Sequence, residues 1–244
     1  MYRQYLLILL LLAISGCAAR LPTYEWVDHD TAIKTIVARD SQIRTVTAQA
    51  ELIFERPDGN SIRLDGAFAT RLPDSLRLRA WKLGTAVFDL TLTPQGLWIM
   101  AGEQAGKRDP RLSQKVSAGE LAKVWSLLNG NIFKDAEIVA FDTAGPRFTI
   151  KQVLEDDRVI TCEVDRKTLT ARRYHLFDPQ GKERFTLDLN DYRRLAKNST
   201  LVWPMEIIAA GEGGKFTADF FDLSINAELA PNTFTPPRRA EKQP

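Results

Sequence analysis

Cysteine and histidine are scarce in this chain of 244 residues, with two of each. Two cysteines are too few for a disulfide-rich scaffold. A zinc site of cysteine and histidine needs several convergent ligands, which the sequence does not supply. A glycine-rich phosphate loop ahead of a helix and a Gly-x-Ser-x-Gly elbow are also absent. The usual signs of a nucleotide-binding protein or an α/β-hydrolase are therefore missing.

An excess of one charge is missing too. Lysine and arginine number 33 against 31 aspartate and glutamate, a net charge of +2 that gives no field favouring nucleic acid. Hydrophobic residues make up 44% of the chain, enough for a substantial core, which argues against a disordered protein.

The first apolar run, from Tyr5 to Ile14, is too short to cross a bilayer, which takes about 20 residues. Arg3 precedes the run, and the small residues Ser15 and Gly16 follow it. This order is typical of an export signal.

The residues Ile14-Ser15-Gly16-Cys17 resemble the bacterial lipobox, with an ordinary signal peptide as the alternative. The resemblance implies a signal peptide over 1–16, lipidation of Cys17 and a lipidated tether over 17–28, held by acyl chains worth about 0.8 kcal/mol per buried methylene. Ala18 and Ala19, where an aspartate would retain the protein in the inner membrane, imply the outer membrane of a Gram-negative bacterium, with the folded domain facing the periplasm. Acylation of Cys17 would leave Cys162 without a disulfide partner, as a small buried core residue.

Hydrophobic periodicity predicts two helices, over 31–44 with Asp30 as N-cap and over 117–128 with Ser117 and Glu120 at capping-box spacing. Alternation of apolar and polar residues predicts strands around 48–55, 62–71, 76–81, 88–92, 97–100, 148–154, 159–164, 169–177, 185–189, 201–209 and 216–225. The expected fold is α+β but mainly β: one curved antiparallel sheet of about 10–11 strands, forming an unclosed half β-barrel with two helices packed on its concave face. We expect one domain over 29–235 and a flexible tail over 236–244.

Two interpretations of the concave side stay open on composition alone. The helices can fill it and leave an ordinary core, or helices and sheet can leave an apolar cavity that holds acyl chains. The candidate cavity-lining residues, chosen from the inward alternation, are Leu52, Phe54, Leu64, Phe68, Leu78, Phe88, Leu90, Trp125 and Leu187.

The stretch "LRLRAWKLGTAVFDLTLTPQGLWIM" (76–100) resembles the LolB family of outer-membrane lipoprotein receptors, and "WPMEIIAAG" with "FTADFFDLSIN" resembles the last strands of the wider LolA/LolB superfamily. The resemblance implies a non-enzymatic protein without cofactor that binds acyl chains of lipoproteins or lipids and delivers them to the membrane. A periplasmic LolA-like carrier is the implied donor. The second half of the chain is longer than in a typical LolB.

In the LolB family an apolar leucine projects from the loop between two of these strands and helps to deliver acyl chains. The resemblance places Leu83 at this position, within a membrane-transfer loop of Trp81, Lys82, Leu83 and Gly84. An exposed leucine beside a tryptophan and a lysine suits a lipid interface. The alternative is that Leu83 folds back into the core.

Other sites are less well supported. His29 lies between two aspartates at a helix entrance, and His175 lies on a strand, so a metal site is not expected. No pair of carboxylates is singled out by its spacing, which leaves a periplasmic hydrolase as a weaker alternative. An envelope module that keeps the fold but holds a protein partner is the stronger one.

Overall fold

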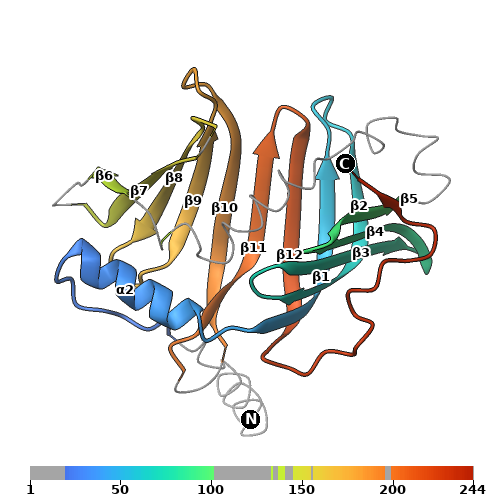
Figure 1. The fold of residues 1–244 in the computed structure, drawn as a ribbon, viewed down its shortest axis with the longest axis horizontal. Helices are drawn as coiled ribbons and strands as arrows, with labels where there is room; N and C mark the ends of the chain where they lie inside the picture. The colour runs from blue at the N-terminus through green and yellow to red at the C-terminus, as the bar shows by residue number, and fades with distance from the viewer. Residues whose placement is uncertain are drawn as a thin grey trace, which may run out of the picture.

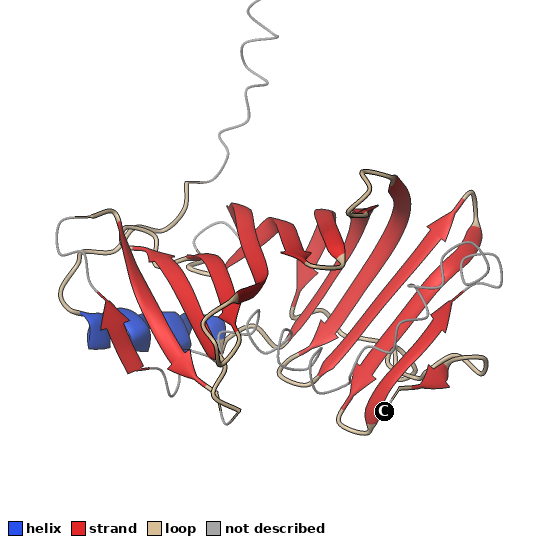
Figure 2. Ribbon diagram, turned by 90° about the horizontal axis from the view of Figure 1, so that it is seen from above, coloured by secondary structure: helices blue, strands red, loops and turns tan. Residues whose placement is uncertain are grey.

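The computed structural model describes residues 20–101, 133, 137–140, 145–154, 156–195 and 199–243. One open antiparallel sheet dominates it, and one helix, α2 (His29–Asp40), lies on the inner side of the curved sheet (Figure 1, Figure 2). The strands are β1 (Thr45–Glu55), β2 (Ser61–Arg71), β3 (Ser75–Lys82), β4 (Thr85–Thr93), β5 (Gly96–Ala101), β6 (Glu137–Ala140), β7 (Arg147–Val153), β8 (Val159–Asp165), β9 (Ala171–Phe177), β10 (Glu183–Arg194), β11 (Val202–Gly211), β12 (Gly214–Ile225) and β13 (Glu241–Lys242).

The prediction of 10–11 strands with two helices on the concave face is wrong. The sheet has thirteen strands, and the described part of the chain contains a single helix. The two additional strands, β6 and β13, have four and two residues, too short to show alternation in the sequence. The second predicted helix, over 117–128, lies outside the described residues; its apolar stripe indicated an amphipathic segment but could not indicate where that segment would dock.

The strand order pairs the first strand with the last long strand in the middle of the sheet. Reading from one edge, it is β13-β5-β4-β3-β2-β1-β12-β11-β10-β9-β8-β7-β6. Consecutive strands therefore form two antiparallel meanders, and the pairing of β1 with β12 connects them. Along this seam Ala50 lies opposite Phe220 and Leu52 opposite Ala218.

Alternation along the strands gives the sheet one apolar face. In β1 the residues Val46, Ala48, Ala50 and Leu52 are buried, whereas the residues between them are partly or fully exposed. Their partners on β2 continue the same surface, with Leu64 opposite Leu52 and Phe68 opposite Ala48. This face is on the concave side and holds the hydrophobic core beneath α2.

Helix α2 begins two residues earlier and ends four residues earlier than predicted. Asp28, rather than Asp30, is the N-cap: its Oδ1 accepts a hydrogen bond from the backbone N–H of Thr31 at 2.8 Å. This bond lowers the pKa of Asp28. Ile36 is fully buried by the sheet, and Ile43, which follows the helix, is buried as well.

The C-terminal segment crosses the outer face of the sheet. After β12 the chain passes over β3, where the carbonyl of Thr233 accepts a hydrogen bond from Nη1 of Arg77 at 2.8 Å, and Phe234 lies under the guanidinium of Arg71 (Figure 1). The chain then forms β13, which pairs with β5 through Glu241 and Ile99. Residues 236–244, predicted to be a flexible tail, thus include a strand of the sheet.

Candidate functional site

The predicted cavity-lining residues lie together on the concave face. Neighbouring strands carry them in register, with Phe68 opposite Leu78 and Leu78 opposite Leu90. Most of these side chains are buried and three are partly exposed. The buried ones are Leu52, Leu64, Phe68, Leu90 and Leu187, and the partly exposed ones are Phe54, Leu78 and Phe88. Trp125 lies outside the described residues.

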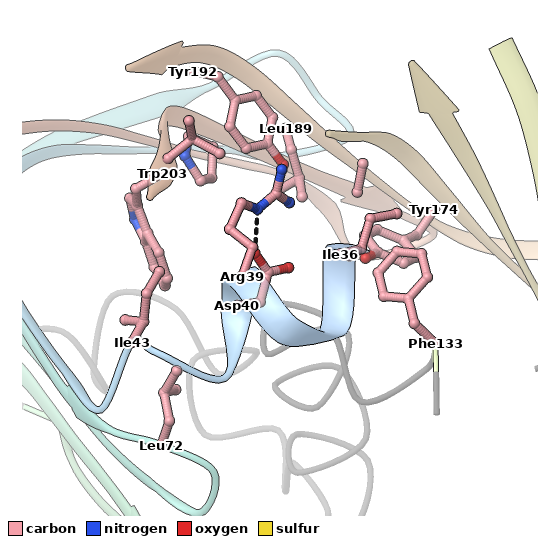
Figure 3. A pocket seen from close by; sticks show the side chains of 13 residues that line it. Ile36, Arg39, Asp40, Ile43, Leu72, Phe133, Tyr174, Leu189, Tyr192 and Trp203 are labelled. Carbon is pink, nitrogen blue, oxygen red and sulfur yellow. Dashed lines mark hydrogen bonds and ion pairs between the residues drawn. The ribbon is translucent and has the colours of Figure 1, made fainter. Parts of the chain in front are cut away.

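A cavity of about 40 Å³ lies between α2 and the sheet. None of the eight predicted residues in the described part of the chain lines it. Its walls come from α2 and the turn after it, from β9 to β11, from the turn after β2 and from Phe133 (Figure 3). They consist of Ile36, Arg39, Asp40, Ile43, Leu72, Phe133, Ala171, Tyr174, Leu189, Tyr192, Val202, Trp203 and Pro204. The cavity is therefore mostly apolar, with a small group of polar side chains.

Arg39 is the most unusual of these polar side chains, because it is 5% exposed in a largely apolar setting. Its Nε donates a hydrogen bond to Oδ1 of Asp40 at 2.7 Å, and its Nη1 donates a long one of 3.4 Å to the carbonyl of Thr168. Burial lowers the pKa of the guanidinium, but the adjacent Asp40 carboxylate outweighs burial and leaves that pKa raised. Arg39 therefore stays charged under the helix.

Tyr192 and Trp203 add two more polar groups to the cavity. The hydroxyl of Tyr192 points towards the Arg39 guanidinium (Figure 3), and burial raises the pKa of Tyr192 well above its ordinary value, so the hydroxyl stays protonated. Nε1 of Trp203 is buried without a hydrogen-bond partner in the described part of the chain. Each of these groups can donate a hydrogen bond.

Sequence reasoning missed this polar group, although a signal was present. Arg39 is not among the site residues predicted from the sequence. The residues Ala32, Ile36, Arg39 and Ile43 are spaced by four, three and four, which is the period of one helix face, and all four are buried. Because arginine usually lies on the exposed face of a helix, this spacing did not predict that Arg39 is buried.

The turn between β3 and β4 has Leu83 and Gly84 at its tip. Both have positive φ, 50° and 77°, as in the two-residue type I′ turn that favours Asn-Gly. The side chain of Leu83 is 94% exposed, Lys82 and Gly84 are exposed, and Trp81 is half-buried on the adjoining strand. Leu83 thus extends into solvent and does not fold back into the core.

The backbone conformation of Leu83 is uncommon for leucine. Six non-glycine residues in the described part of the chain have positive φ, and four of them are aspartate or asparagine, which tolerate it. The other two are Leu169, which is 3% exposed, and Leu83. Core packing explains the leucine at 169. Nothing in the fold explains the leucine at 83.

The remaining candidates have structural roles. His29 opens α2 and packs edge-on against Trp26 at 4.8 Å between ring centroids, and burial lowers its pKa. His175 lies on the outer face, with Nδ1 2.6 Å from Oε2 of Glu183. Cys162 is fully buried, which raises the pKa of its thiol. No cluster of three or more histidine, cysteine or acidic side chains suited to a metal ion occurs among the described residues.

One open curved sheet with a helix against its concave face defines the class of this fold. No protein-family model matches the chain, and no curated protein is detectably similar in sequence. Solved structures are similar: a LolA superfamily protein from Nitrosomonas europaea matches with a TM-score of 0.57 and 12% identity, over 83% of this chain and 97% of that one. A DUF1329 family protein from Desulfovibrio piger matches with a TM-score of 0.59 and 11% identity, over 85% and 98%.

A Vibrio parahaemolyticus domain described as an outer membrane lipoprotein-sorting protein matches with a TM-score of 0.58 and 11% identity, over 85% of this chain and 97% of that one. The chain therefore has the fold of the LolA/LolB superfamily, as the resemblance in the sequence implied. In the described part of the chain, no helix has the length and hydrophobicity needed to span a membrane.

Proposed function

We propose that this protein is a non-enzymatic lipoprotein of the bacterial envelope, anchored in the outer membrane through Cys17. It binds acyl chains of lipoproteins or lipids against the concave face of the sheet, beneath α2, and delivers them to the membrane through the turn at Leu83. The fold shared with a lipoprotein-sorting domain supports the kind of ligand. A periplasmic LolA-like carrier is the proposed donor.

The observation that carries this proposal is the exposed leucine at the tip of the β3–β4 hairpin. Leu83 is 94% exposed and occupies a position where asparagine or glycine would be more stable. A large apolar side chain held in water against backbone preference points to a partner that takes it up. With Lys82 beside it and Trp81 on the same strand, that partner has an apolar interior and a polar surface, as a bilayer does.

Binding of an acyl chain also requires space. Pockets for small molecules hold about 300–1,000 Å³, and the cavity under α2 has about 40 Å³. We propose that α2 moves away from the sheet when a chain enters. The helix itself contributes three buried side chains, Ala32, Ile36 and Arg39, and the entering chain would cover the apolar surface of the sheet that displacement of the helix uncovers.

The test replaces Leu83 by glutamate and measures transfer of an acylated peptide from the purified protein to lipid vesicles. We expect Leu83→Glu to abolish transfer and to leave the free energy of unfolding within about 0.5 kcal/mol of wild type. Val153→Glu is the matched control, because Val153 is 53% exposed on a different strand. It should leave transfer unchanged.

Two outcomes count against this function. If Leu83→Glu transfers the acylated peptide as well as wild type does, the turn has no role in delivery. Mass spectrometry of lipid co-purified from membranes under mild conditions tests the cavity: stoichiometric lipid or acylated peptide supports the carrier, whereas an empty interior favours an envelope module that holds a protein partner.

A further inference from the structure

The cavity beneath α2 contains hydrogen-bond donors without matching acceptors. Arginine carries five N–H donors and no acceptor, and the described contacts of Arg39 involve Nε and Nη1. Within the described ranges Nε1 of Trp203 is buried without a hydrogen-bond partner. The hydrogen bonds of the Arg39 guanidinium come from Nε and Nη1, which leaves Nη2 as a further donor. Since a buried donor without a partner is costly, the cavity is complementary to a group that accepts hydrogen bonds.

The remaining walls of the cavity suit a hydrocarbon. Ile36 and Ile43 come from the helix side, and Leu189 and Val202 come from the sheet. A volume of about 40 Å³ has room for about three water-sized groups, which is the size of a carboxyl or ester carbonyl group with its first methylene. The ligand that fits both features is an oxygen acceptor at the end of an apolar chain.

We propose that Arg39 and Tyr192 form a binding site for the carboxyl or carbonyl oxygen of an acyl group. The inference rests on the proposed binding of acyl chains and adds which end of the chain the fold recognises. The Arg39 guanidinium supplies a charge-assisted hydrogen bond from Nη2, and the Tyr192 hydroxyl, which points at the same spot, supplies a second (Figure 3). Asp40 holds Nε and so fixes the orientation of the guanidinium.

A solely structural role for Arg39 makes a different prediction. In that case the residue would only tie α2 to the turn after β8 through Thr168, and the cavity would not distinguish ligands by their polar end. Comparison of ligands with the same chain and different ends separates the two roles. Palmitate carries a carboxylate and methyl palmitate an ester carbonyl. Hexadecanol carries a neutral hydroxyl, which also accepts hydrogen bonds but has neither the charge of the carboxylate nor a carbonyl oxygen.

The experiment measures the affinity of the full mature protein for these three ligands by displacement of a fluorescent fatty acid. We expect palmitate or methyl palmitate to bind about tenfold more tightly than hexadecanol. A preference for palmitate identifies a free fatty acid as the source of the acceptor, and equal binding of the ester identifies an esterified lipid. In Arg39→Met the advantage over hexadecanol should disappear, while hexadecanol binds as in wild type.

Two further variants keep the test informative if Arg39→Met folds poorly. Tyr192→Phe removes one hydroxyl and should reduce the preference without abolishing it. Arg44→Met removes an exposed arginine just beyond the helix and should change nothing. Equal affinity of wild type for all three ligands would overturn the polar site while leaving acyl-chain binding intact. Failure of all three to bind would overturn the proposed function as well.

Discussion

Leu83 has a backbone conformation and an exposure that are both unfavourable for the fold. Its φ of 50° costs an L-residue about 1 kcal/mol, and its exposed side chain contributes no packing in return. Asparagine tolerates this conformation. We therefore expect Leu83→Asn to raise the free energy of unfolding by about 1 kcal/mol, measured by urea titration, and to abolish transfer to vesicles. A loss of stability would show that the side chain packs against the protein in solution.

At the same scale, the sequence allowed some side chains to be placed and not others. Leu52 and Leu187 were predicted to face inward because alternation assigns a side to each residue of a strand. Arg39 and Tyr192 were missed because burial of a charged or polar group depends on contacts between distant elements. The volume of the cavity under α2 could not be predicted either, because it depends on the distance between the helix and the sheet.

At the scale of elements, the strands with clear alternation could be predicted, and their pairing followed from short turns. The pairing of β1 with β12 could not be predicted in the same way, because no turn joins these strands. Its register places carboxylates side by side on the outer face, with Asp219 between Glu206 and Glu51. Burial raises the pKa of Asp219, and the two neighbouring carboxylates raise it further.

This row of acidic residues predicts that removing the charge of Asp219 raises the free energy of unfolding, and that the increase depends on pH. The pKa of Asp219 in the folded protein is above the ordinary value of 3.8, so its ionised form destabilises the fold above that folded pKa, and the penalty disappears as the pH falls through both values. Asp219→Asn should therefore stabilise the protein by about 0.5–1 kcal/mol at pH 7 and by nothing below about pH 3. Urea titrations at the two pH values test this; an equal gain at both would exclude charge as the cause.

At the scale of the whole molecule, the C-terminal segment holds the outer face of the first meander. Beneath it Asp89 is 3% exposed and Thr91 is fully buried, although both lie on the outer face. Asp89 accepts two hydrogen bonds from Arg77, at 3.1 and 2.8 Å, and Arg77 in turn donates to the carbonyl of Thr233. The segment therefore shields an ion pair that would otherwise be open to water.

Removal of residues 229–244 tests this arrangement. We expect the truncation to lower the free energy of unfolding by about 2 kcal/mol or more, because it breaks the hydrogen bond to Thr233 and exposes the ion pair. Arg239→Ala is the control, since it changes the charge of an exposed residue in the segment and should have no effect. A truncated protein as stable as wild type would show that the segment only rests on the sheet.

The seam between β1 and β12 has a consequence for biosynthesis. The first strand to leave the ribosome finds one of its two neighbours at once, in β2, but its other neighbour is the last long strand to be made. Until then β1 presents an unpaired edge on which another nascent chain could add a strand. We expect a protein with this order of strands to need protection of that edge until β12 has been made.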